Sequence, residues 1–134
     1  MNENWQLWGT KPELQSKFNI ERLKGNLSDM ESTKQLSSLI SDCYEPDMKI
    51  LDVGCNVGHY LVGLRKKFPI LEYTGVDAYA SYINEAKQAF SKDPNAKFEI
   101  KDIFKPIFPE NKFDIVYCCN VLLHLPDFRI PVTN

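Results

Sequence analysis

From Lys49 onward, short apolar strand patterns alternate with helical patterns, and no other feature of the sequence constrains the fold as strongly. The strand patterns lie at 49–53, 72–76, 97–100 and 113–118. Apolar residues at helical spacing lie between them, at 59–68 and 83–90. Because strands that alternate with helices form parallel βαβ units with right-handed crossovers, we predict an α/β fold with a parallel sheet and helices on both faces.

The residues before Pro46 are expected to be helical. Leu14, Phe18 and Leu23 have the spacing of one face of a first helix, which should end near Gly25. The chain therefore opens with helical structure before the sheet begins.

A second amino-terminal helix is expected to begin with a capping box formed by Ser28 and Glu31. Its apolar stripe is Leu36, Leu39, Ile40 and Cys43. We therefore divide the chain into an amino-terminal helical segment, residues 1–46, and a sheet domain, residues 47–134.

Composition narrows the class of protein. The 134 residues suffice for one domain, and the formal net charge of −2 gives no support for a basic face that would bind nucleic acid. The amino terminus does not read as a signal peptide, and no apolar stretch is long enough to span a membrane. The four cysteines lack zinc-site spacing and are expected to be reduced thiols, so we expect a cytoplasmic protein without a metal site.

Acidic residues follow three successive strand patterns. Asp52 ends the first, Asp77 ends the second and Asp102 follows the third, while Gly54 and Gly58 form a turn after the first. In an open parallel sheet, ligands bind outside the carboxyl ends of the strands. We expect Asp52 to meet a cationic group, Asp77 to accept hydrogen bonds from ribose hydroxyls, and Asp102 to accept one from an adenine amine. This set favours a positively charged nucleoside over a nucleotide.

Four segments together resemble the motifs of the class I S-adenosylmethionine (SAM)-dependent methyltransferases. They are ILDVGCNVGHYL, YTGVDAY, FEIKDIF and FDIVYCCNVLLHL, and they occur in the family's order and spacing from about residue 48 to residue 126. The resemblance implies a Rossmann-like fold, SAM as the cofactor, and transfer of its methyl group to an acceptor, for which we expect a small molecule.

The resemblance also assigns the cofactor-binding residues. They are Asp52, Gly54, Cys55, Asn56, Gly58, Asp77, Ala78, Asp102, Ile103, Cys119 and Asn120. Cys119 and Asn120 are expected at the methionine end of the cofactor, through main-chain atoms. Asn56 stands where the family usually has a glycine, and Asn is one of the few residues that tolerate the left-handed backbone of such a turn.

Other residues have two interpretations each. His124 is a weak candidate for a catalytic general base, and the alternative is a helix histidine with local hydrogen bonds. His59 could contact the cofactor carboxylate. Trp5, Trp8 and Phe18 could belong to a lid, although aromatic packing of an amino-terminal helix is the favoured interpretation.

The sequence contains only the first four strand motifs of the family fold. That fold has seven strands ordered 3-2-1-4-5-7-6, whereas the sequence ends at Asn134, so we expect a truncated domain that binds SAM without turnover. An exposed fourth strand could then support a homo-oligomer. A non-catalytic SAM-binding module, partner of a complete enzyme, is the alternative function. A dinucleotide-dependent oxidoreductase is disfavoured because Asn56 and His59 replace two fingerprint glycines.

Overall fold

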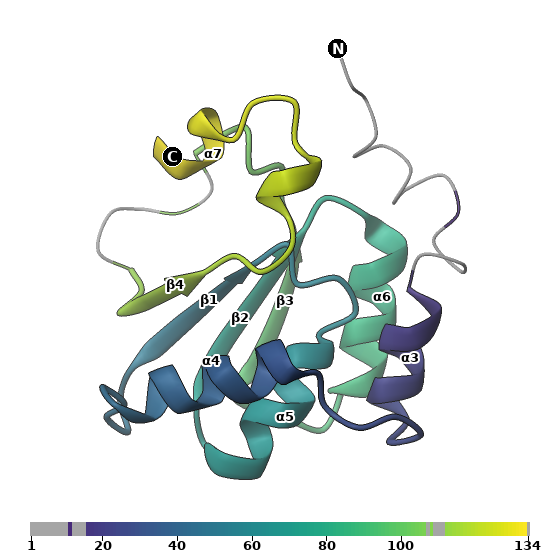
Figure 1. The fold of residues 1–134 in the computed structure, drawn as a ribbon, viewed down its shortest axis with the longest axis vertical. Coiled ribbons are helices and arrows are strands. Elements are labelled where there is room, and N and C mark those ends of the chain that lie inside the picture. The colour runs from purple at the N-terminus through teal and green to yellow at the C-terminus, as the bar shows by residue number, and fades with distance from the viewer. Residues whose placement is uncertain (1–10, 12–15, 107, 109–111, 134) are drawn as a thin grey trace.

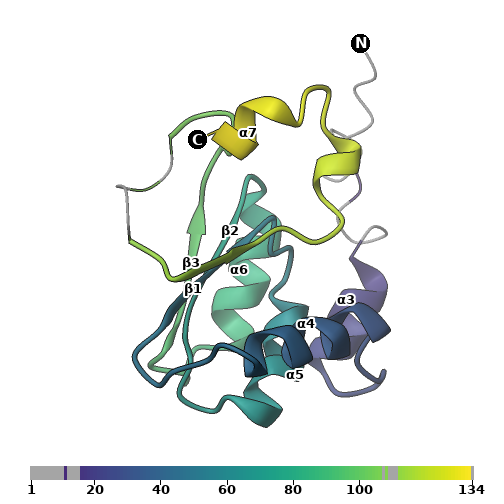
Figure 2. The same ribbon diagram turned by 60° about the vertical axis from the view of Figure 1, so that its left-hand side comes forward.

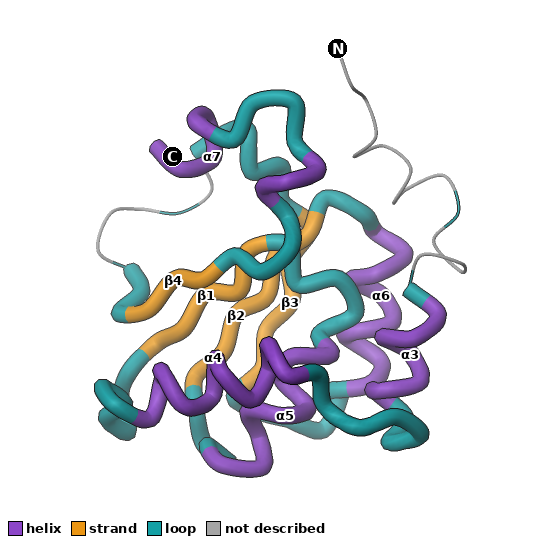
Figure 3. The backbone as a smooth tube through the Cα atoms, in the orientation of Figure 1, coloured by secondary structure: helices purple, strands orange, loops and turns teal. Residues whose placement is uncertain are grey.

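Four parallel strands form the centre of the protein (Figures 1 and 3). The computed structural model describes residues 11, 16–106, 108 and 112–133. The strands are β1 (Lys49–Val53), β2 (Glu72–Asp77), β3 (Ala96–Ile100) and β4 (Ile115–Tyr117). Their order is β3-β2-β1-β4, which confirms the parallel, Rossmann-like sheet and matches the first four positions of the expected order.

Along the chain, helices precede the first strand and connect the first three strands. They are α3 (Lys17–Leu23), α4 (Glu31–Ser41), α5 (His59–Lys67) and α6 (Ala80–Ala89), followed at the carboxyl end by the 3-10 turn η2 (Leu122–His124) and α7 (Arg129–Thr133). The sequence patterns placed α5 and the first three strands to within one residue of these bounds.

The main core lies on one face of the sheet. Ile50, Tyr73 and Phe98 point from β1, β2 and β3 into a cluster that receives Ile40 from α4 and Leu64 from α5, together with residues of α6. Successive right-handed crossovers in one direction put α5 and α6 on the same side. Figure 2 gives the view in which these helices lie together beside the sheet.

We expected helices on both faces. In the sheet, β2 and β3 lie on one side of β1, and β4 lies on the other side. The segment that connects β3 to β4 must therefore cross the face of the sheet opposite to α5 and α6. The described residues of this segment form a loop and not a helix. Within the described residues, the core cluster receives helices from one side alone.

The amino-terminal helices differ in detail from the sequence expectation. The capping box is wrong, because Met30 is the N-cap of α4 and no side chain caps it. Leu39 is 68% exposed, so the apolar stripe of α4 is narrower than predicted. The first helix ends as expected, with Gly25 in the left-handed conformation at φ 77°. Leu14, Trp5 and Trp8 lie outside the described residues.

Candidate cofactor pocket

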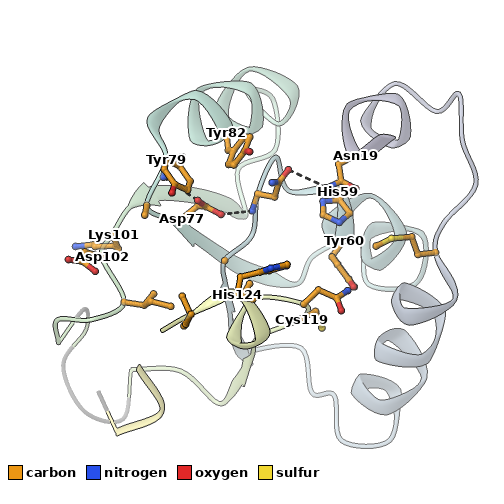
Figure 4. A pocket seen from close by; sticks show the side chains of 18 of the residues that line it. Asn19, His59, Tyr60, Asp77, Tyr79, Tyr82, Lys101, Asp102, Cys119 and His124 are labelled. Atoms are coloured by element: carbon orange, nitrogen blue, oxygen red, sulfur yellow. Dashed lines mark hydrogen bonds between the residues drawn. The ribbon is translucent and has the colours of Figure 1, made fainter. Parts of the chain in front are cut away.

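A cavity of about 390 Å³ opens at the carboxyl ends of the strands, where the sequence placed the site. Figure 4 shows Lys101 and Asp102 on one side of the cavity, and Asn19, His59 and Tyr60 on the other. Of the expected cofactor-binding residues, those that line the cavity are Gly54, Asn56, Asp77, Ala78, Asp102, Ile103, Cys119 and Asn120.

The turn after β1 uses three left-handed residues. Gly54, Asn56 and Gly58 have φ angles of 75°, 52° and 79°. A Cβ at Gly54 would collide with the side chain of Val121, so this glycine lets the turns after β1 and β4 approach each other. Asn56 holds the conformation expected of it, and its side-chain Oδ1 accepts the N–H of Val57 at 2.9 Å.

Asp77 is fixed by main-chain hydrogen bonds at the end of β2. Its Oδ2 accepts the N–H of Asn56 at 2.9 Å, and its Oδ1 accepts the N–H of Tyr79 at 3.1 Å. Burial raises the pKa of Asp77, while these hydrogen bonds act in the opposite direction. Each carboxylate oxygen keeps a second lone pair for a ligand in the cavity.

Asp52 lies beneath the pocket rather than in its lining. The side chain is 2% exposed, and its Oδ2 accepts hydroxyl hydrogens from Tyr73 at 2.6 Å and Tyr117 at 3.0 Å. Burial outweighs these bonds and raises the pKa of Asp52 to about 7. Its Oδ2 thus binds two tyrosine hydroxyls, and the expected contact with a cationic group, directly or through water, stays a prediction.

Cys55 and Gly58 also lie outside the cavity lining. Cys55 is 1% exposed and packs against β2, where Gly75 leaves room for its sulfur. A Cβ at Gly58 would come within 2.9 Å of the Phe98 ring. Both residues are explained by packing beneath the turn.

The far end of the cavity is formed by the segment after β3. The exposed carboxylate of Asp102 accepts the N–H of Phe104 at 3.0 Å, which holds the loop in a turn, and Ile103 lies beside it in the lining. Lys101 also lines the cavity, but its ammonium lies 3.3 Å from Glu99.

The segment after β4 closes the side opposite Asp77. Cys119, Asn120 and His124 line the cavity there, and Asn120 has a left-handed φ of 59°. Figure 4 shows His124 and Cys119 across the cavity from Asp77 and Tyr79.

Comparison with known proteins identifies the family. Residues 50–132 match a family described as a methyltransferase domain, which is more than half of the chain. This chain belongs to the methyltransferase-domain family. The match covers β1 from its second residue, the whole turn after it and the other three strands, so the family and the class I fold predicted from the motifs are confirmed.

Similar proteins agree with this assignment. An uncharacterised methyltransferase of Schizosaccharomyces pombe is 38% identical over 87 residues, covering 59% of this chain and 31% of that protein. Phosphoethanolamine N-methyltransferase 3 of Arabidopsis thaliana is 29% identical over 99 residues, covering 73% and 20%. The chain thus spans about a third or less of the length of these relatives.

A solved structure shares the fold. SAM-bound CalS10, an amino pentose methyltransferase from Micromonospora echinaspora, superposes with a TM-score of 0.64 at 21% identity, covering 89% of this chain and 48% of that one.

Several lining residues of this methyltransferase domain were not predicted. They come mainly from α3, α4 and the starts of α5 and α6, and are Asn19, Arg22, Met30, Tyr60, Tyr79 and Tyr82. Asn19 donates from Nδ2 to Oδ1 of Asn56 at 3.4 Å, so the unusual motif residue contacts the amino-terminal helix. The one available signal was therefore Asn56 itself, the departure from the family pattern. Phe18 lines the cavity while remaining 65% exposed, which agrees better with a covering position than with core packing.

Among the described residues, no helix is long and apolar enough to cross a membrane. All four cysteines are free thiols.

Proposed function

We propose that this chain binds SAM in the cavity and that the protein transfers the methyl group of SAM to a small-molecule acceptor. Asp77 is the observation that carries the proposal. Its carboxylate borders the cavity, is held by two main-chain N–H groups, and retains acceptor capacity suited to a pair of ribose hydroxyls.

The other lining residues suit the adenine and the amino-acid part of SAM. Asp102 and Ile103 are suited to an adenine amine and ring, and Gly54 and Asn56 line the cavity where the amino-acid part would lie. SAM supplies a sulfonium leaving group, so its methyl carbon is already activated when it binds. The work of the chain is then to hold the reacting groups in line and to keep water out.

Three features support a small-molecule acceptor and a cytoplasmic setting. The cavity has a volume of about 390 Å³, the net charge is −2, and the cysteines are free thiols. The Arabidopsis and Micromonospora proteins are named for small acceptors, phosphoethanolamine and an amino pentose. His124 is our candidate general base for an acceptor that must lose a proton.

A calorimetric titration tests cofactor binding. The chain should bind SAM and its demethylated product S-adenosylhomocysteine, and it should not bind NAD. Asp77→Ala should weaken both by about 10- to 100-fold, as expected for loss of charge-assisted hydrogen bonds. Glu85→Ala removes the same charge from the exposed surface of α6 and should leave affinity unchanged. NAD binding in preference to SAM would overturn the proposal.

The acceptor requires a separate assay. Transfer of labelled methyl from SAM to a panel of small amines and hydroxyl compounds, with phosphoethanolamine among them, should give product. Labelling of protein or RNA in the same panel, without any small-molecule product, would contradict a small-molecule acceptor while leaving SAM binding intact.

A further inference from the structure

A second cavity lies along the side of β3, apart from the cofactor pocket. It has a volume of about 380 Å³ and is lined by residues 96–99 together with residues at the end of α6, among them Lys87 and Phe90. Side chains of successive strand residues point to opposite faces of a sheet. Because four residues in a row line this cavity, it must follow the edge of the strand and not one face of the sheet. We call it the β3 groove.

The edge of β3 carries main-chain groups that no other strand uses. β3 stands at one end of the sheet and pairs with β2, and beyond it the described residues supply no strand. The N–H of Lys101 donates to the carbonyl of Asp77 at 3.0 Å, so the odd-numbered residues of this segment face β2. The N–H and C=O groups of Phe98 and Ile100 therefore face outward. Within the described part of the chain they form no turn, loop or side-chain hydrogen bond.

The floor of the β3 groove is apolar. The rings of Phe90, at the end of α6, and Phe98, on β3, stack with their centroids 5.5 Å apart. Phe98 is 5% exposed, so it forms the base of the groove and does not project from it. Figure 1 shows α6 beside β3, so this floor lies between a helix and an open strand edge. A strand added to β3 would set alternate side chains over the floor.

The charges that line the β3 groove do not cancel. Its two acids, Asp93 and Glu99, already pair with cations that lie outside the lining, at 2.6 Å and 3.3 Å. Its two lysines, Lys87 and Lys97, are exposed and form no ion pair with any other described residue. The groove therefore presents uncompensated positive charge beside an unpaired main-chain edge.

We propose that the β3 groove binds an acidic segment of a partner protein, which adds to the sheet as a strand along β3. The main chain of that segment would pair with Phe98 and Ile100. Its apolar side chains would lie on the aromatic floor, and its carboxylates would meet Lys87 and Lys97. Pairing of two β3 edges would bring the uncompensated lysines of both copies together, so a second copy of this chain is a poor occupant. The inference does not depend on what the cofactor pocket binds.

The probe for the β3 groove is a labelled synthetic peptide of about six residues in which glutamate and valine alternate. Fluorescence anisotropy should show saturable binding to the wild-type chain. A peptide with lysine in place of every glutamate should not bind, because it meets the groove with like charge. A third peptide keeps the glutamates but carries N-methyl groups on its main-chain nitrogens, which block strand pairing. It should bind at least about tenfold more weakly than the parent peptide.

Ile100→Pro tests the main-chain contact. The N–H of Ile100 faces away from β2, so proline removes an outward donor and leaves the pairing of β2 with β3 in place. The substitution should weaken the glutamate–valine peptide by about tenfold or more. Ile100→Val keeps the N–H, and its affinity should stay within about twofold of the wild type. The side chain is 52% exposed, so both variants should fold, and circular dichroism checks that they do.

The double variant Lys87→Gln, Lys97→Gln tests the charge of the groove. It should weaken the glutamate–valine peptide by about fivefold or more, as expected for the loss of two exposed ion pairs. The double variant Lys17→Gln, Lys67→Gln removes the same charge from exposed positions on α3 and α5, and it should leave the affinity unchanged.

Amide hydrogen exchange locates the contact without any substitution. When the glutamate–valine peptide is added, the N–H groups of Phe98 and Ile100 should exchange more slowly, because they become hydrogen-bonded to the added strand. The N–H groups of Lys97 and Glu99 already face β2, so their exchange should change little.

Four results would overturn the inference. Equal binding of the N-methylated peptide would rule out strand addition, and equal binding of the lysine peptide would rule out an acidic partner. Full affinity in folded Ile100→Pro, with unchanged exchange at Phe98, would place the peptide elsewhere on the chain. Failure of the glutamate–valine peptide to bind would mean that Lys87 and Lys97 only protect the edge from pairing. If the wild-type chain then also self-associated and Ile100→Pro abolished this, the occupant would be a second copy.

Discussion

At the scale of single residues, Asp52 carries the most unusual ionisable group beneath the site. Its carboxylate is buried between the hydroxyls of Tyr73 and Tyr117, and burial raises its pKa from 3.8 to about 7. The carboxyl therefore binds a proton more tightly in the folded chain than in the unfolded chain. Its contribution to stability is fully present below about pH 4 and is lost as the pH rises through about 7.

Asp52→Asn should remove this pH dependence. The free energy of unfolding of the variant, minus that of the wild type, should rise by about 2 to 4 kcal/mol between pH 4 and pH 8, because the asparagine does not titrate. Urea unfolding at a series of pH values measures the difference. His59, with its lowered pKa, acts in the opposite direction but is present in both chains and cancels. A difference that stays constant with pH would refute the assignment.

The residues of the site were predictable where a local pattern determines them. Asp77 ends β2 and Asp102 follows β3, and the carboxyl ends of the strands in a parallel sheet lie at the edge where ligands bind. The depth of Asp52 was not predictable, because Tyr73 and Tyr117 determine it from positions 21 and 65 residues away. No sequence pattern reports which side chains will share one carboxylate.

At the scale of elements, Arg65 joins the end of α5 to the segments around β2 and β3. Its Nε donates to Asp93 at 2.6 Å, and its Nη1 donates to the carbonyls of Phe68 at 3.2 Å and Leu71 at 2.8 Å. The Arg65 and Asp93 side chains are each 16% exposed. The Arg65 side chain thus donates to two main-chain carbonyls after α5 and to a carboxylate before β3.

Arg65→Ala should lower the free energy of unfolding by about 2 to 4 kcal/mol, since it removes the ion-pair partner of the mostly buried Asp93 carboxylate and a donor to the Leu71 carbonyl. Lys66→Ala is the control from the next position. Lys66 also forms a 2.6 Å ion pair, with Asp29, but its side chain is 63% exposed, so its removal should cost less than about 1 kcal/mol. Denaturant unfolding measures the free energy of unfolding of both variants. Equal decreases in the two variants would contradict the idea that burial makes the Arg65 ion pair the stronger one.

Helix α3 is connected to the turn after β1 by a polar contact that the sequence pattern did not predict. Apolar spacing predicted that a helix exists there, but α3 has no buried residue within its bounds, and Asn19 connects it to Asn56. This hydrogen bond helps to hold α3 over the cavity, and apolar periodicity alone cannot predict such a contact.

Asn19→Ala should loosen α3 over the cavity. Amide hydrogen exchange within 17–23 should accelerate several-fold, because few apolar contacts remain to hold the helix. Asn26→Ala, which removes an exposed hydrogen bond to Glu21 near the same helix, should have a smaller effect. Asn56→Gly should reproduce the Asn19 result, and unchanged exchange in both variants would show that the contact is dispensable.

At the scale of the whole molecule, β4 is one of the two edge strands of the four-stranded sheet. It pairs with β1, and on its other side the described residues supply no strand. Val116 in this strand is 59% exposed. Open edges of this kind pair readily with other chains, which is the basis for our proposal of a homo-oligomer through β4.

Val116→Lys should suppress self-association. Sedimentation velocity should find the wild-type chain forming larger species as concentration rises, while the lysine variant stays monomeric because a charged edge resists pairing. Leu39→Lys, at an exposed position on α4, should behave as the wild type. A wild-type chain that is monomeric at every concentration would rule out association through this edge.

The place of β4 in the chain also has a kinetic consequence. Ile50 pairs with Tyr73, 23 positions along the chain, but with Ile115, 65 positions along. Closing the longer loop costs more entropy, so we expect the transition state for folding to contain the β1–β2 pairing and to lack β4. The segment after β4, which carries Cys119 and His124, would then form after the transition state for folding. A ligand gripped between that segment and Asp77 should accordingly lower the unfolding rate and leave the folding rate nearly unchanged, a difference visible in the two arms of a chevron plot.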